Sequence, residues 1–105
     1  MKKLLKLMMV LAVLSAAQAS AADAPQALAQ KNGCLACHSV EKKILGPAYK
    51  DVAAKYKGDK GAEARLVAKV KAGGGGVWGD MAMPANSPQV KDEDIKTIVQ
   101  WVLSL

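Results

Sequence analysis

The sequence predicts an all-α protein of four to five short helices, and three observations lead to that class. Apolar residues recur at helical spacing in three segments after residue 47. Glycine and proline stand at the ends of these segments and not inside them. No run alternates apolar and polar residues as a half-buried strand would. The sequence therefore favours one small domain of helices joined by loops.

Residues 1–22 have the organisation of a secretory signal peptide. Three lysines lie within the first six residues, an apolar run covers 7–14, and small residues follow it. The apolar run is too short for a comfortable transmembrane helix, although an uncleaved anchor is the alternative. Cleavage after Ala21 or Ala22 would leave a domain of residues 23–105. We expect that domain to be a periplasmic monomer that meets the membrane only as a precursor.

The charge of the predicted mature domain limits the classes of partner that it could bind. Removing residues 1–22 takes away three lysines and no acidic residue, so the formal net charge falls from +6 to +3. The remaining lysines are scattered, and no basic run is interleaved with aromatic residues, which argues against nucleic-acid binding. A local lysine face could still steer an acidic protein partner.

Cap and breaker residues set the expected helix bounds. Asp23 can cap the first helix, Gly33 suits its left-handed end, and Pro47 suits the first turn of the second. Helices are expected at 23–31, 48–57, 62–72 and 92–104, with a short helical turn through Cys37 and His38.

The segment between the last two helices is irregular. Four glycines at 73–76 end the third helix, either to let the chain approach a flat ligand or as a plain linker. Pro84 and Pro88 exclude a regular helix over 77–89. A loop of this length in a small domain needs a functional reason.

The pentapeptide Cys34-Leu35-Ala36-Cys37-His38 holds every cysteine and histidine of the chain. This spacing is typical of c-type haem attachment: each thiol can add to one vinyl group, and the imidazole can supply one axial nitrogen. A thioredoxin-like pair would require alternating strands and helices, and a structural zinc site would be one ligand short. A plain disulfide is a third alternative. The sequence therefore predicts one covalent haem c, bound by Cys34 and Cys37, with His38 on the iron.

A second axial ligand has to be a methionine, because no second histidine exists. Met81 and Met83 remain once the leader is removed. Met83 is favoured because Pro84 restricts its backbone, which leaves Met81 for packing or for contact with the haem edge. Two protein ligands would close the iron to substrates and favour electron transfer. The alternative is an enzyme or sensor in which Met83 dissociates to admit peroxide, carbon monoxide or nitric oxide.

Two further groups have roles that the residue types suggest. The free ring nitrogen of His38 needs a hydrogen-bond partner, and a backbone carbonyl near Gly46 or Pro47 is a candidate. The indole of Trp78 could donate to a haem propionate, or it could pack in the core.

Several segments together make the chain similar to the small periplasmic cytochromes c-551/c-552 of class I. They span nearly the whole predicted mature domain in order: Gly33 to His38, Val40, Gly46 to Ala53, Gly76 to Gly79, Met83-Pro84, Asn86 and Trp101 to Ser104.

This resemblance implies the class I cytochrome c fold, with four to five short helices around one covalently attached haem. It implies a soluble periplasmic carrier of single electrons between a respiratory donor and a terminal reductase, oxidase or peroxidase. It also implies a role for each matching residue. Cys34 and Cys37 carry the haem, and His38 and Met83 bind its iron. The remaining implied contacts are Pro47 accepting from His38, Lys69 and Trp78 at a propionate, and Asn86 orienting the Met83 sulfur.

The chain departs from the family pattern in two places. Asp80, Ala82 and Ala85 stand where prolines are common, which predicts a looser methionine loop, each replacement costing about 0.5–1 kcal/mol through unfolded-state entropy. Lys91 stands where a serine-type cap is expected, which weakens the start of the last helix unless Asp92 caps instead.

Overall fold

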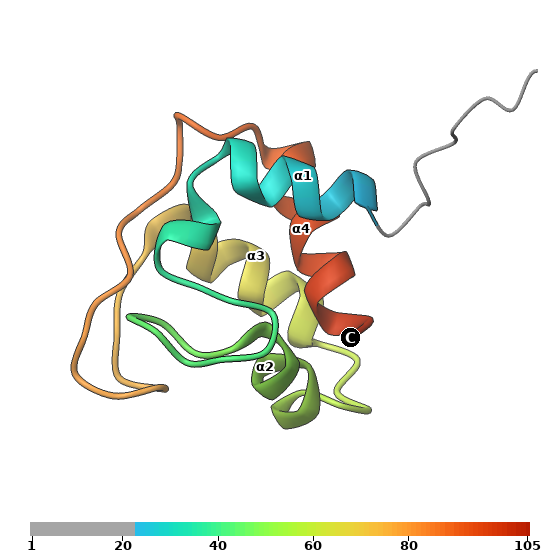
Figure 1. The fold of residues 1–105 in the computed structure, drawn as a ribbon, viewed down its shortest axis with the longest axis vertical. Helices are drawn as coiled ribbons and strands as arrows, with labels where there is room; N and C mark the ends of the chain where they lie inside the picture. The colour runs from blue at the N-terminus through green and yellow to red at the C-terminus, as the bar shows by residue number, and fades with distance from the viewer. Residues whose placement is uncertain (1–22) are drawn as a thin grey trace, which may run out of the picture.

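The computed structural model describes residues 23–105, so the predicted signal peptide lies outside the described part of the chain. Four α-helices and one short 3-10 turn make up the domain (Figure 1). Within 23–105 there is no strand, only an isolated bridge, and no helix is long and apolar enough to cross a membrane. The elements are α1 (Asp23–Lys31), η1 (Cys34–Ala36), α2 (Tyr49–Lys55), α3 (Ala62–Ala72) and α4 (Asp92–Leu103).

The observed bounds confirm the all-α prediction and correct one detail. Helices α1 and α3 have the predicted limits, and α2 and α4 are slightly shorter than expected. The turn predicted through Cys37 and His38 is wrong in position, because η1 occupies Cys34–Ala36. Gly33, with φ at 78°, ends α1 and lets the chain enter a new turn at once. The His38 N–H still donates to the Cys34 carbonyl at 3.0 Å, so the turn delivers the histidine.

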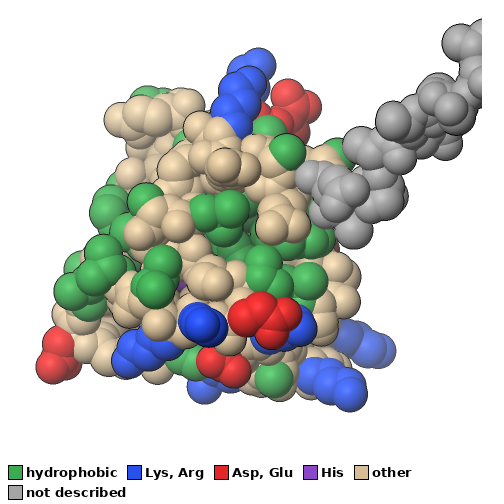
Figure 2. Space-filling model, viewed as in Figure 1, with side chains coloured by type: hydrophobic (Ala, Val, Ile, Leu, Met, Phe, Trp, Pro, Cys, Tyr) green, Lys and Arg blue, Asp and Glu red, His purple; other side chains and the backbone are tan. Residues whose placement is uncertain are grey.

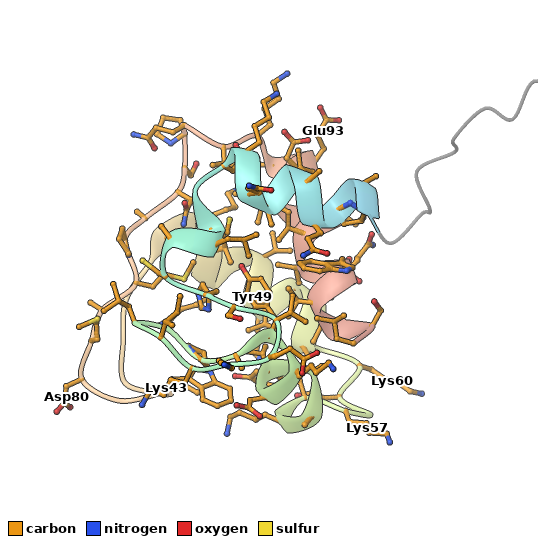
Figure 3. All side chains as sticks on the ribbon, in the orientation of Figure 1. Lys43, Tyr49, Lys57, Lys60, Asp80 and Glu93 are labelled. Carbon is orange, nitrogen blue, oxygen red and sulfur yellow. The ribbon has the colours of Figure 1, made fainter. Side chains whose placement is uncertain are left out.

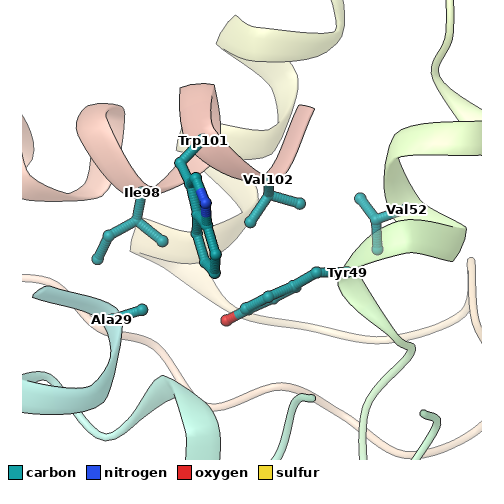
Figure 4. Packing of buried hydrophobic residues seen from close by; sticks show 6 residues of the cluster. All are labelled: Ala29, Tyr49, Val52, Ile98, Trp101 and Val102. Atoms are coloured by element: carbon teal, nitrogen blue, oxygen red, sulfur yellow. The ribbon is translucent and has the colours of Figure 1, made fainter. Parts of the chain in front are cut away.

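Helix α4 contacts each of the other three α-helices and forms the centre of the domain. Its apolar stripe meets α1 and α2 in the main core cluster, drawn in Figure 4. Trp101 is 7% exposed, which confirms the prediction that it is a core residue. Its ring meets Tyr49 edge-on, with centroids 5.6 Å apart and an interplanar angle of 81°. The cluster consists of Ala29, Tyr49, Val52, Ile98, Trp101 and Val102.

A second, smaller cluster joins α4 to α3. Val90, Ile95 and Val99 are buried, and Ile95 is 1% exposed. The predicted inward face of α3 packs against them through partly buried Leu66, Val67 and Val70. Both clusters thus depend on α4. Its side chains also form one wall of the space between α2, α3 and the long loop that follows α3.

The start of α4 has the weakness that the sequence predicts. Lys91 is the N-cap residue, and its side chain makes no capping hydrogen bond, while Asp92 is already helical. We expect Lys91→Ser to raise the free energy of unfolding by about 0.5–2 kcal/mol, since serine can bond a free N–H of the first turn. Chemical denaturation measures the change.

The control is Lys91→Ala, which removes the lysine cation from the positive helix end and adds no acceptor. A serine variant no more stable than the alanine variant would show that capping contributes nothing at this end.

Candidate haem-binding site

One largely apolar pocket collects every site residue that the sequence predicts. It lies between α2, α3, α4 and the loop that follows α3. The α4 wall is formed by Ile95, Ile98, Val99 and Val102. The predicted residues that line it are Cys34, Cys37, His38, Pro47, Lys69, Trp78, Met83 and Asn86.

The two cysteines are free thiols that line the pocket together with His38. Both are partly buried. Burial raises the pKa of the Cys34 thiol, and a hydrogen bond with Tyr49 opposes that rise. The two cysteines form no disulfide in the structure, and both line the same largely apolar pocket.

The His38 imidazole is oriented by its own backbone surroundings. Its Nδ1 lies 2.8 Å from the Pro47 carbonyl oxygen, which accepts the hydrogen bond, as the sequence suggested. With the proton on Nδ1, the lone pair of Nε2 is left for a metal. A second hydrogen bond joins the two ends of the segment at 37–46, in which the Gly46 N–H donates to the Cys37 carbonyl at 2.7 Å.

Two residues that seat the imidazole were missed as functional residues. A Cβ built on Gly46 would lie 2.5 Å from His38 Cε1, 2.8 Å from Nδ1 and 3.0 Å from Nε2. These three short distances place it over the ring face and not at the ring edge. The Tyr49 ring stacks on the same imidazole, with centroids 4.8 Å apart and an interplanar angle of 19°.

Tyr49 connects the His38 ring to the core, because the Tyr49 ring also belongs to the main hydrophobic cluster (Figure 4). Burial is the largest cause that raises the pKa of its phenol, so the ring stays neutral across the physiological range. For Gly46, the sequence offered one signal, namely a residue without a side chain directly before Pro47. The spacing of Tyr49 on α2 indicated only a buried face, since periodicity does not report what a buried ring touches.

The two methionines of the loop differ in exposure. Met83 is half-buried, whereas Met81 is 64% exposed, and both line the pocket. The backbone of Met83 forms the isolated bridge with Gly74. This arrangement agrees with the preference for Met83 as the inward sulfur.

The remaining predicted residues lie at the pocket with contacts of their own. Trp78 is 40% exposed, so it is not a core residue, and the Lys55 Nζ lies 5.6 Å from its ring centroid. Lys69 Nζ donates to the Gly75 carbonyl at 3.3 Å. The Asn86 amide donates to the carbonyls of Val70 and Pro84, each at 3.2 Å. The propionate and sulfur contacts expected for these side chains stay predictions.

The donor set fits a covalent haem better than a bare metal ion. The pocket offers two thiols, one oriented imidazole and two thioethers, of which Met83 is the less exposed, within an apolar lining. Histidine and methionine are ordinary axial ligands of haem iron in cytochromes c. In residues 23–105, no group of three His, Cys, Asp or Glu side chains could hold a metal ion.

A short-helix domain whose pocket gathers a C-x-x-C-H motif and a loop methionine defines a c-type haem protein. Comparison with known proteins gives the family. The model of the cytochrome c family matches residues 22–105. The chain belongs to the cytochrome c family, and its relatives place it among the cytochromes c-551/c-552.

Three relatives illustrate the likeness. Cytochrome c-551 of Allochromatium vinosum is 60% identical over 87 residues, covering 83% of this chain and 92% of the relative. Cytochrome c-551 of Pseudomonas aeruginosa is 49% identical over 88 residues, covering 84% and 83%. The crystal structure of wild-type Nitrosomonas europaea cytochrome c552 has a TM-score of 0.72 at 49% identity, covering 76% of this chain and 98% of that one.

Membership of this family establishes the cofactor and the class of activity. The protein carries one covalently bound haem c with its iron. It is an electron carrier and not an enzyme. The class I fold expected from the resemblance is confirmed by the four helices and by the structural likeness to cytochrome c552.

Proposed function

We propose that this protein carries single electrons in the periplasm, between a respiratory donor and a terminal reductase, oxidase or peroxidase. His38 and Met83 are proposed as the axial ligands, and Cys34 and Cys37 as the attachment residues. The observation that carries the proposal is that an oriented imidazole and a half-buried thioether line one apolar pocket. Haem held there supplies an iron that accepts and returns one electron.

The protein side chains serve to hold and tune this centre. The Pro47 carbonyl and the face of Tyr49 restrict rotation of the His38 ring, so the axial nitrogen needs little rearrangement on electron transfer. Lys69 and Trp78 line the pocket and are proposed to bind a propionate. The Asn86 amide is proposed to orient the Met83 sulfur while it holds the Pro84 carbonyl.

The ferric spectrum of the purified holoprotein tests the axial assignment. Methionine–iron ligation produces a weak charge-transfer band at the red end of the visible spectrum, and we expect it at neutral pH. The same preparation should not bind carbon monoxide in the ferrous state on mixing. Absence of the band together with rapid carbon monoxide binding would indicate an open iron and would refute the carrier proposal in this form.

We propose that the protein is exported, because residues 1–22 have the charge and length pattern of a signal peptide. We propose a mature monomer of residues 23–105. The family match begins at residue 22, which supports a domain that starts where the leader ends. A mass spectrum of the exported protein gives the cleavage site and the number of covalent haems in one measurement.

We propose that partners dock on an apolar face at the mouth of the pocket. Exposed apolar side chains gather on the left of Figure 2, where the loop at 41–46 and the loop after α3 come to the surface. Lys42 and Lys43 flank this face in sequence, and Lys55 lies over Trp78. The exposed apolar residues are Ile44, Leu45, Val77, Trp78 and Met81. An acidic rim around an apolar contact is the complementary partner surface.

Docking of this kind predicts a rate that depends on salt. The second-order rate of electron transfer to an acidic partner protein should fall by roughly tenfold or more from low to physiological ionic strength, because steering is screened. Lys43→Gln should lower the rate at low salt and weaken the salt dependence. Stopped-flow mixing at several ionic strengths measures both.

Lys60→Gln is the matched control, since it removes the same charge. Figure 3 places Lys60 on the opposite side of the domain from Lys43. Equal effects of the two variants would show that net charge matters and that the proposed face does not. A rate indifferent to ionic strength in the parent protein would refute electrostatic steering altogether.

A further inference from the structure

The glycines that follow α3 contact the backbone around Met83 directly. The Gly74 N–H donates to the Met83 carbonyl at 2.9 Å, and the Met83 N–H donates to the Gly74 carbonyl at 2.9 Å. The two segments lie side by side in Figure 1, as the isolated antiparallel bridge requires. A residue has one backbone donor and one main-chain carbonyl, so both backbone polar groups of Met83 are bonded to one partner.

Gly73 allows this approach because it has no side chain. A Cβ built on Gly73 would lie 2.5 Å from the Met83 carbonyl oxygen, 2.7 Å from the Ala85 nitrogen and 2.9 Å from the Pro84 carbonyl carbon. These neighbours are backbone atoms, which cannot rotate away as the end of a flexible side chain can. Gly73 also has φ at 73°, and its N–H closes α3 on the Lys69 carbonyl at 2.7 Å.

The last turn of α3 holds the other side of the same segment. The Asn86 N–H donates to the Val70 carbonyl at 3.1 Å, and the Ser87 N–H donates to the Lys71 carbonyl at 3.2 Å. The last carbonyls of a helix have no partner within the helix. The bonds that satisfy the end of α3 are therefore the bonds that hold the loop at 83–87 in place.

We infer that Gly73 is a positioning residue that determines which methionine sulfur is offered to the pocket. Its bare Cα permits the Gly74–Met83 bridge, which fixes the backbone of Met83 and leaves Met81 exposed. Gly73 and Gly74 are thus more than a plain linker, while Gly74 and Gly75 also line the pocket, which is compatible with the other expectation, a close approach to a flat ligand. This inference rests on the proposed ligation of iron by Met83.

Gly73→Ala and Gly76→Ala form a matched pair for the test. Both positions have positive φ, 73° and 101°, so both alanines strain the backbone. Only the Gly73 Cβ meets the Met83 segment, since nothing lies within 4 Å of a Cβ at Gly76. Gly76→Ala therefore shows the effect of an alanine at positive φ without the contact, and we attribute a larger effect of Gly73→Ala to its overlap with the Met83 segment.

The experiment titrates the ferric protein with imidazole, which displaces methionine from the iron. Loss of the charge-transfer band measures this displacement. We expect Gly73→Ala to lose the band at an imidazole concentration at least roughly tenfold lower than the parent protein, because overpacking against backbone weakens the native loop. Gly76→Ala should require at least several times more imidazole than Gly73→Ala. Equal sensitivity of the two variants, or no change in Gly73→Ala, would overturn the inference.

Met81→Leu in the Gly73→Ala background detects exchange of ligands. If the methionine band of Gly73→Ala disappears when Met81 is replaced, the glycine selects between the two sulfurs as inferred. If the band is unaffected, Met81 never reaches the iron and the selecting role is wrong.

A measurement on the parent holoprotein covers the case in which Gly73→Ala does not fold. Amide hydrogen exchange should be slow at Met83 and Gly74, and similar at the two, because their N–H groups belong to one bridge. Exchange at Met83 as fast as at an open loop would refute the bridge and with it the inference. Absence of a methionine band from the parent protein would instead refute the ligand assignment of the proposed function.

Discussion

Replacing Met83 with alanine is expected to leave the haem attached and to lower the reduction potential sharply. The proposed attachment residues Cys34 and Cys37 precede α2, far in sequence from the loop that carries the methionine. We expect a fall on the order of a tenth of a volt or more, because axial ligands set haem potentials over roughly 0.8 V and methionine favours the higher values. Potentiometric titration measures the fall, and the same variant should lose the ferric charge-transfer band.

Met81→Ala is the control for this prediction. It removes the same side chain from the same loop, but from a position that is 64% exposed. Its potential should stay close to that of the parent protein, and its charge-transfer band should remain. If Met81→Ala caused the large fall and Met83→Ala did not, the assignment of the sulfur ligand would have to be reversed.

Gly46→Ala is expected to destabilise the domain strongly, because the added methyl group overlaps the His38 ring. The new Cβ would lie 2.5 Å from His38 Cε1 and over the face of the ring. Stacked Tyr49 and the bond to Pro47 hold the imidazole in place, so the ring cannot move aside without losing one of them. We expect the free energy of unfolding to fall by about 1–3 kcal/mol, as overpacking usually causes.

A matched control separates this overlap from a general intolerance of alanine. Gly61, like Gly46, is not among the glycines with positive φ, and its Cβ would lie 2.7 Å from Arg65 Nη1. That atom is the far end of an exposed side chain paired with Asp59, so it can move at a cost within about 1 kcal/mol. Denaturant unfolding measures the loss of unfolding free energy in each variant, and we expect a larger loss for Gly46→Ala than for Gly61→Ala. Equal losses would show that the imidazole seat is not rigid.

Most of the fold was predictable because helix signals are local. Asp23, Gly33 and Pro47 mark helix ends within a few residues of where they act, and α1 and α3 have the predicted bounds. The candidate site was equally accessible, since His38 and the cysteines stand in one pentapeptide. Elimination then left two methionines, and the structure brings both to the pocket.

The features that the sequence did not predict depend on contacts between distant segments. The packing of Gly46 and Tyr49 on His38 brings a loop glycine and a helical ring to one imidazole, and no periodicity encodes that meeting. The Gly74–Met83 bridge likewise involves backbone atoms only, so no side chain signals it. The shift of the helical turn to Cys34–Ala36 is a local exception: Gly33 has the predicted left-handed angle, and the new turn begins at the very next residue.

The position of α4 as the wall of the pocket has a consequence for the order in which the domain can be completed. The attachment motif is made early in synthesis, whereas the side chains of α4 that line the pocket are made last. A chain that ended before Asp92 would keep both thiols and His38 and would lack the surface that covers the cofactor. We therefore expect haem attachment on a chain whose last helix is not yet docked, with the docking of α4 completing the pocket wall.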